Sequence, residues 1–181
     1  MNAREYQNKV AAIFRNIFDD NLVKTEWDSV KFDGHFSNHK SIYAPRHDIA
    51  VGPFNRWLPD LDIGDDQTES MKSHPFTKKL IEDELGRRGD LKNVWNSFSR
   101  CYLAIEIEFS GTSKHILGSI VNASVSGSIG IVIANHDNIE KAVRTSNYIR
   151  RLEGMELLRS NDLQNLIIFE DEQFLKFLSN F

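Results

Sequence analysis

Hydrophobic side chains recur along this chain with two different periods, and each period predicts one kind of element. Between residues 3 and 19 the large apolar residues stand three or four positions apart, as on one face of an amphipathic helix. Residues 102–109 alternate instead, which predicts a strand with apolar side chains on one face and Glu106 and Glu108 on the other. Residues 128–135 are almost uninterruptedly apolar, as is typical of a central strand covered on both faces.

The first half of the chain adds two strands and a long connection. Strands are expected at residues 29–33 and 41–54, and the second of these contains Asp48. Residues 55–98 show no extended apolar alternation, apart from a short helix that Gly86 is expected to close. Because so long a connection is unusual inside a compact domain, we interpret it as an insertion.

The second half alternates helices with strands. A helix is predicted from Ser113 to Ser126, and residues 139–181 follow as a C-terminal extension with a basic helix, a strand and a closing helix. The whole order suits one domain over residues 1–181. Its expected fold class is α/β, with a central mixed β-sheet flanked by helices.

Composition limits the partners and the compartment. The 181 residues carry a formal net charge of −4 with a pI near 5.9, so nucleic acid would have to be bound by a local basic patch. No apolar run approaches the roughly 18 residues that span a bilayer, so no membrane partner is expected. The single cysteine, Cys101, fits a reducing compartment, and we expect a cytoplasmic protein.

Three acidic residues form the strongest candidate for chemistry. If the strand of Asp48 pairs with the strand of Glu106 and Glu108, the three carboxylates share one surface, while His47 should point to the opposite face. At an effective dielectric constant of about 20, two carboxylates about 5 Å apart repel by about 3 kcal/mol. Such a cluster is stable chiefly around a cation or in water, and hard oxygen ligands favour Mg²⁺ or Mn²⁺ over zinc.

Lys114 adds a positive charge near these acids. It lies in the first turn of the predicted helix that follows Glu108, where unpaired N–H groups also favour an anion such as a phosphate. A divalent ion, carboxylates that hold it and a lysine beside a phosphate together indicate metal-assisted phosphodiester hydrolysis.

The order α-β-β(Asp48)-β(Glu106-Ile107-Glu108)-α-β, over roughly residues 1–135, resembles the PD-(D/E)XK nuclease superfamily, which has the restriction endonuclease-like fold. The resemblance implies that an aspartate on one strand and an E-x-K motif on the next bind Mg²⁺ and position the attacking water. Glu108 here replaces the lysine, as in the E-x-E variant of some restriction endonucleases, and Lys114 matches members whose lysine has moved to the following helix. Pro45 stands three positions before Asp48 instead of directly before it.

The resemblance also implies a partner and an assembly. The expected activity is a Mg²⁺-dependent endonuclease of restriction type that cleaves DNA, with Glu5 of the first helix as a candidate extra acid. Restriction enzymes that cut both strands usually pair as twofold dimers, so a homodimer through the helix of residues 139–154 is expected. Four polar or basic residues are candidates for binding the nucleic acid: Asn122, Arg144, Arg150 and Arg151.

Other interpretations of the same residues stay open. Glu106 and Glu108 could simply face solvent on a half-buried strand. Asp48 could cap a neighbouring turn, and Lys114 could be an ordinary lysine on a helix surface. A nuclease fold without catalysis, acting as a module that binds nucleic acid or protein, is therefore the second hypothesis. An unrelated α/β protein whose acidic residues are accidental is the third.

Overall fold

The computed structural model describes residues 1–29, 45–54, 64–88, 95–96, 99–154 and 165–181. The strands are β1 (Val23–Asp28), β2 (Arg46–Val51), β3 (Cys101–Glu108), β4 (Gly127–Ala134) and β5 (Leu166–Glu170). The helices are α1 (Ala3–Ile17), α2 (Gly64–Ser73), α3 (Pro75–Arg88), α4 (Ser113–Ser126), α5 (His136–Gly154) and α6 (Asp171–Leu178), with a 3-10 turn, η1 (Asp20–Leu22), after α1.

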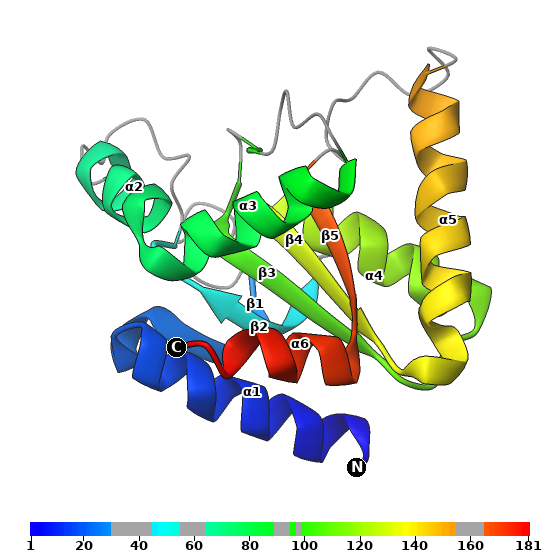
Figure 1. Cartoon of the computed structure of the whole chain (residues 1–181), viewed down its shortest axis with the longest axis horizontal. Helices are drawn as coiled ribbons and strands as arrows, with labels where there is room; N and C mark the ends of the chain where they lie inside the picture. The colour runs from blue at the N-terminus through cyan, green and yellow to red at the C-terminus, as the bar shows by residue number, and fades with distance from the viewer. Residues whose placement is uncertain (30–44, 55–63, 89–94, 97–98, 155–164) are drawn as a thin grey trace, which may run out of the picture.

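The five strands form one mixed sheet in the order β1-β2-β3-β4-β5 (Figure 1). The pairs β1–β2 and β2–β3 are antiparallel, whereas the pairs β3–β4 and β4–β5 are parallel, with α4 and α5 in their connections. The prediction of an α/β protein with a mixed sheet flanked by helices is confirmed. Strand β3 lies at the centre of the sheet, so both of its edges are paired.

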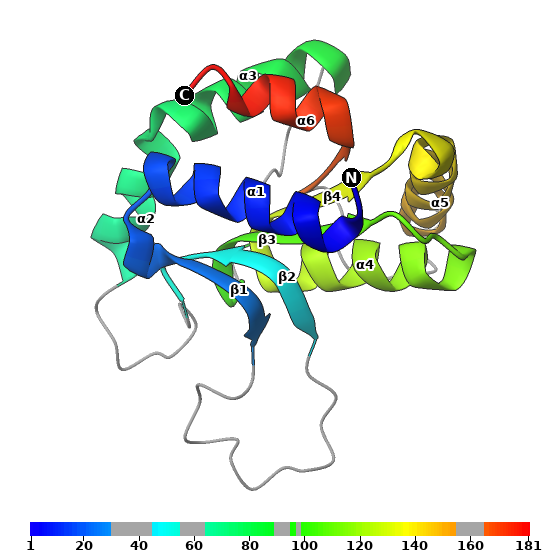
Figure 2. The same cartoon turned by 90° about the horizontal axis from the view of Figure 1, so that it is seen from below.

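Helices cover both faces of the sheet (Figure 2). Helices α1, α3 and α6 lie on one face. Large aromatic residues such as Tyr6, Phe14 and Phe174 fill the core between them and the sheet. Helices α4 and α5 lie on the other face, where Ile116 and Ile120 pack against β4 and β5. Each face of the central strands is therefore buried, which agrees with their isoleucine-rich sequence.

Most predicted elements lie within a few residues of their observed positions. Strand β1 ends at Asp28, before the predicted strand at 29–33, of which residues 30–33 fall outside the described ranges. The expected insertion at 55–98 contains both α2 and α3, and α3 continues to Arg88 past Gly86. Gly86 does not close this helix because a glycine inside a helix costs only about 1 kcal/mol. No helix in the described part of the chain is long and apolar enough to cross a membrane.

Helix α4 lies unusually close to the sheet because β4 carries a glycine beneath it. A Cβ atom at Gly130 would lie 2.7 Å from the carbonyl carbon of Ala123 in α4, a distance that any larger residue would have to widen. The glycine thus lets the backbone of α4 come close to β4.

One hydrogen bond joins the two ends of the described chain. The Tyr6 hydroxyl of α1 donates to the carbonyl oxygen of Asp171 at the start of α6 over 2.8 Å, inside the larger core. The C-terminal helix is thereby attached to the same core as the N-terminal helix.

We expect Tyr6→Phe to lower the free energy of unfolding by about 1 kcal/mol, because the part-buried Asp171 carbonyl loses its donor while the ring packing is kept. Urea denaturation measures the change. Tyr148→Phe is the matched control, since the Tyr148 side chain is 63% exposed, and it should change stability by less than about 0.5 kcal/mol. Equal stabilities for both variants and the wild type would show that this bond does not hold α6 in place.

Candidate functional site

The pairing of β2 with β3 brings Asp48 beside the acidic end of β3. Ile49 is the partner of Ile105 in this antiparallel register, so Asp48 and Glu106 are the next residues on the two strands. Residues opposite each other on neighbouring antiparallel strands direct their side chains to the same face. The expected juxtaposition of Asp48 with the strand of Glu106 and Glu108 is therefore found.

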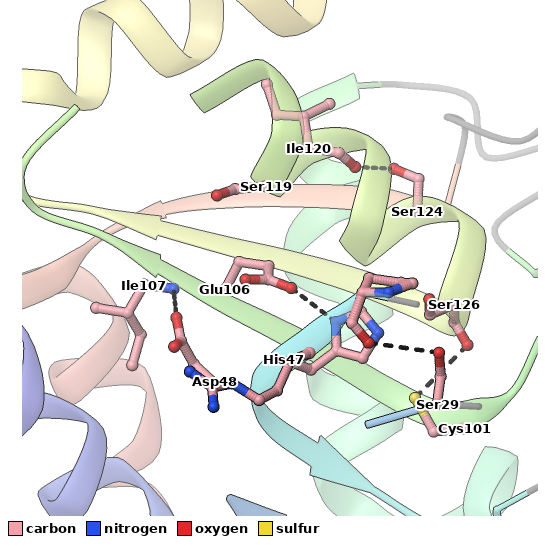
Figure 3. Close-up of polar contacts among 12 residues, drawn as sticks. Ser29, His47, Asp48, Cys101, Glu106, Ile107, Ser119, Ile120, Ser124 and Ser126 are labelled. Atoms are coloured by element: carbon pink, nitrogen blue, oxygen red, sulfur yellow. Dashed lines mark hydrogen bonds and ion pairs between the residues drawn. The ribbon is translucent and has the colours of Figure 1, made fainter. Parts of the chain in front are cut away.

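Strand β2 leaves the regular ladder at Asp48. The Oδ2 atom of Asp48 accepts a hydrogen bond from the backbone N–H of Ile107 over 2.7 Å, in place of a backbone carbonyl (Figure 3). The backbone carbonyl of Asp48 accepts instead from Nε2 of Gln7 in α1, over 2.6 Å. The alternative in which Asp48 caps a neighbouring turn is wrong, because its carboxylate binds a strand.

The side chain of His47 does not lie on the face of the sheet that was predicted for it. Its Nδ1 atom lies 2.7 Å from Oε1 of Glu106, so His47 points to the same face as the glutamate and not to the opposite one (Figure 3). The imidazole is fully buried, and it stacks on the indole of Trp27 with ring centroids 5.9 Å apart.

A local distortion of two neighbouring strands explains this orientation. In a regular strand His47 and Ala50, three residues apart, would lie on opposite faces, but both lie on the face of Trp27. Glu26 of β1, across from Asp48, has a φ angle of 53°, in the left-handed region that is unfavourable for residues other than glycine. The regular β2–β3 pairing ends at Ile49, so the strand turns before it reaches His47.

Glu106 and Glu108 are both buried, with only 6% and 7% of their surfaces exposed. The alternative of a solvent-facing strand is therefore wrong for them, since β3 is central and α4 covers this face. The two oxygens of Glu108 accept hydrogen bonds from the hydroxyls of Ser110 (3.3 Å) and Ser119 of α4 (3.2 Å). Glu106 is held only by His47 among the residues that the structure describes.

Burial and mutual repulsion disfavour the ionised form of these carboxylates. Burial raises the pKa of Glu106 well above 4.5, and the charges of Asp48, Glu108 and Glu26 raise it further. Burial also raises the pKa of Asp48, although the hydrogen bond from Ile107 opposes the shift. Burial lowers the pKa of His47 to about 4, so the imidazole is neutral near pH 7. The site thus holds acids that lack a compensating charge.

Two residues of the surroundings were missed by the sequence analysis. Glu26 adds a fourth acid, which is paired with Arg4 (2.7 Å) and with Arg46 (3.0 Å). Gln7 donates to Glu26 as well as to Asp48. Glu26 and Gln7 come from β1 and α1, far from the acids in sequence, and the only available signal for Gln7 was a polar residue next to the apolar helix stripe.

The predicted extra acid has another role. Glu5 belongs to a capping box, in which its carboxylate accepts from the N–H of Asn2 and its own N–H donates to the Asn2 side chain. Such a box stabilises the start of a helix and explains this glutamate without catalysis. The acid that lies near Asp48 is Glu26 instead, so the structure assigns Glu5 to the helix terminus.

Lys114 lies at the first turn of α4, as expected, but its side chain is exposed. Among the described residues it forms no ion pair with Asp48, Glu106 or Glu108. The structure therefore does not bring the lysine into contact with the acids. Asn122 is half-buried on the same helix, two turns further on.

The basic residues of α5 differ from one another. Arg144 and Arg151 are exposed, whereas the guanidinium of Arg150 donates to the carbonyl oxygen of Leu166 over 3.2 Å. Arg150 thus joins α5 to β5, and Arg144 and Arg151 are the ones open to a ligand.

The donor set fits a hard divalent ion of the magnesium type. No three His, Cys, Asp or Glu side chains in the described ranges are placed to hold a metal ion together, so the predicted ligand set of Asp48, Glu106 and Glu108 is not found as a group. Mg²⁺ needs less, since it is usually held by one or two carboxylates, with water and phosphate as its other ligands. Oδ1 of Asp48 and Oε2 of Glu106 accept no hydrogen bond within the described residues, and neither is sealed from solvent.

Comparison with family models, with curated proteins and with solved structures finds no match to this chain.

We expect the buried charge of Glu106 to destabilise the metal-free fold as the pH rises. The folded pKa of Glu106 is raised, so its stabilising contribution is complete below the unfolded value of 4.5 and is lost as the pH rises through the folded pKa. Glu106→Gln should therefore become progressively more stable relative to the wild type as the pH rises from 4.5 to neutral. Urea denaturation in EDTA across this range measures the gain.

Glu172→Gln on α6 is the control, because its side chain is exposed and the stability difference from the wild type should not vary with pH. His47 acts in the opposite direction: its lowered pKa removes stability as the pH falls from 6.5 toward 4. A Glu106→Gln protein that is less stable than the wild type throughout would contradict the buried-charge account.

Proposed function

We propose that this protein is a Mg²⁺-dependent endonuclease that hydrolyses DNA phosphodiester bonds, with a restriction endonuclease-like fold. The observation that carries the proposal is a pair of carboxylates, the half-buried Asp48 and the buried Glu106, on adjacent strands, each with one oxygen that accepts no hydrogen bond from the described residues. The order α1-β1-β2-β3-α4-β4 supports it, since it matches the α-β-β-β-α-β core that the resemblance implies.

Each carboxylate has a separate task in this proposal. Asp48 and Glu106 would hold the ion through Oδ1 and Oε2, and Glu108, fixed by two serine hydroxyls, would keep a negative charge beside them. When bound, the ion would lower the pKa of a water molecule and stabilise the charge on the phosphate. The excess negative charge of the buried acids favours a divalent cation at this position over an empty site.

The cations near the site would bind the DNA backbone. Lys114, exposed at the start of α4, would contact a phosphate and not the acids. Arg144 and Arg151 on α5 are exposed and would be further phosphate contacts, whereas Arg150 is engaged in joining α5 to β5. A twofold dimer through α5 stays part of the proposal, because cleavage of both strands requires two such sites.

One observation favours a second candidate function. The E-x-K position is occupied by Glu108, and Lys114 has no ion pair with the acids in the described residues. A fold that has lost its catalytic lysine would act as a module that binds nucleic acid or protein without cutting it. This alternative predicts DNA binding that does not depend on Glu106.

Purified protein incubated with supercoiled plasmid and Mg²⁺ or Mn²⁺ should produce nicked and linear DNA. Asp48→Asn and Glu106→Gln should each lower the rate by at least about 100-fold, because each removes a charge that holds the ion. The conversion of plasmid forms is followed by gel electrophoresis, and EDTA should stop the reaction.

Glu172→Gln, which neutralises an exposed acid on α6 that has no part in the candidate site, is the matched control and should cut at the wild-type rate. Cleavage that survives Asp48→Asn and Glu106→Gln would identify a contaminant. DNA that is bound but never cut, with either metal, would favour the non-catalytic module.

A further inference from the structure

His47 is placed to orient the Glu106 carboxylate, and sequence reasoning assigned it no function. Its ring is fully buried, stacks on Trp27 and brings Nδ1 within 2.7 Å of Oε1 of Glu106. Packing on Trp27 fixes the plane of the imidazole, and the hydrogen bond then fixes the carboxylate. A glutamate side chain loses rotamer freedom when it is ordered, so a fixed partner matters for its position.

The direction of this hydrogen bond follows from the chemistry of the two groups. An ionised carboxylate can only accept, so Nδ1 must carry the proton when Glu106 is charged. The other ring nitrogen, Nε2, is enclosed and has no hydrogen-bond partner in the described structure. In the Nδ1–H form this orphan is a lone pair and not an unpaired donor.

The bond occupies one Glu106 oxygen and leaves the other one open. Oε1 is engaged by His47, whereas Oε2 accepts no hydrogen bond among the described residues and is not sealed from solvent. His47 and Asp48 are adjacent on β2, and the distortion of this strand brings both side chains to Glu106. The Asp48 side chain faces the other acids, and the His47 side chain holds Glu106.

We propose that His47 is a positioning residue, which donates its Nδ1–H to Glu106 and so directs Oε2 toward the divalent ion. This inference rests on the proposed function. Outer hydrogen bonds of this kind typically change metal affinity by about 10- to 100-fold. A merely structural role for His47 would leave metal affinity unchanged in a folded variant.

The test measures Mn²⁺ binding by isothermal titration calorimetry without DNA. His47→Leu removes the donor and should weaken Mn²⁺ binding by about 10- to 100-fold, whereas His47→Asn keeps an N–H near the place of Nδ1 and should restore most of it. His115→Leu is the matched control, because this histidine is exposed on α4 and should not alter binding. A folded His47→Leu protein that binds Mn²⁺ like the wild type overturns the proposal.

A second measurement needs no variant and no metal. Two-dimensional ¹⁵N spectra of the imidazole in the metal-free wild type, at neutral pH where the ring is uncharged, should show His47 as the Nδ1–H tautomer. The Nε2–H tautomer would overturn the proposal, even if His47→Leu fails to fold. Wild-type protein that binds no Mn²⁺ contradicts the proposed function, and the tautomer then still decides whether His47 orients Glu106.

Discussion

The burial of two carboxylates at the centre of the sheet is the constraint on which the rest of this site depends. Glu106 and Glu108 lie on β3, with paired strands on both sides and α4 over them. Removing a carboxylate from water is costly unless a partner compensates its charge. The structure compensates Glu108 with two serine hydroxyls and Glu106 with a single neutral histidine. This incomplete compensation of charge is the basis for proposing a divalent cation at the site.

The neighbouring strand, β2, is distorted where it meets these acids. A regular β2 would direct His47 away from the acids, but the strand departs from its ladder at Asp48, and Glu26 on β1 adopts a left-handed backbone. Strained backbone of this kind persists only where the surrounding structure holds it, and it is frequent at functional sites. Here Gln7 of α1 bonds both Glu26 and the carbonyl of Asp48, so the N-terminal helix supports the distortion.

The grouping of these acids lowers the stability of the metal-free fold, although the proposed function needs it. The charges that would hold an ion raise one another's pKa, so the metal-free site is electrostatically unfavourable near neutral pH. The large aromatic core between the sheet and helices α1, α3 and α6 lies on the opposite face, away from the acids. A rigid scaffold on one face can therefore tolerate an unfavourable site on the other, as is common when binding groups are held in position before the ligand arrives.

The sequence by itself determined the α/β class, most element positions and the juxtaposition of Asp48 with Glu106, because all three follow from local periodicity and from the pairing of neighbouring strands. It did not reveal the orientation of His47, the participation of Glu26 and Gln7, the capping role of Glu5 or the separation of Lys114 from the acids. Alternation along a strand assumes regular backbone, and β2 is irregular at the residue that matters. Only the tertiary structure decided these contacts, since they depend on where α1, β1 and α4 pack against β3, which no local pattern encodes.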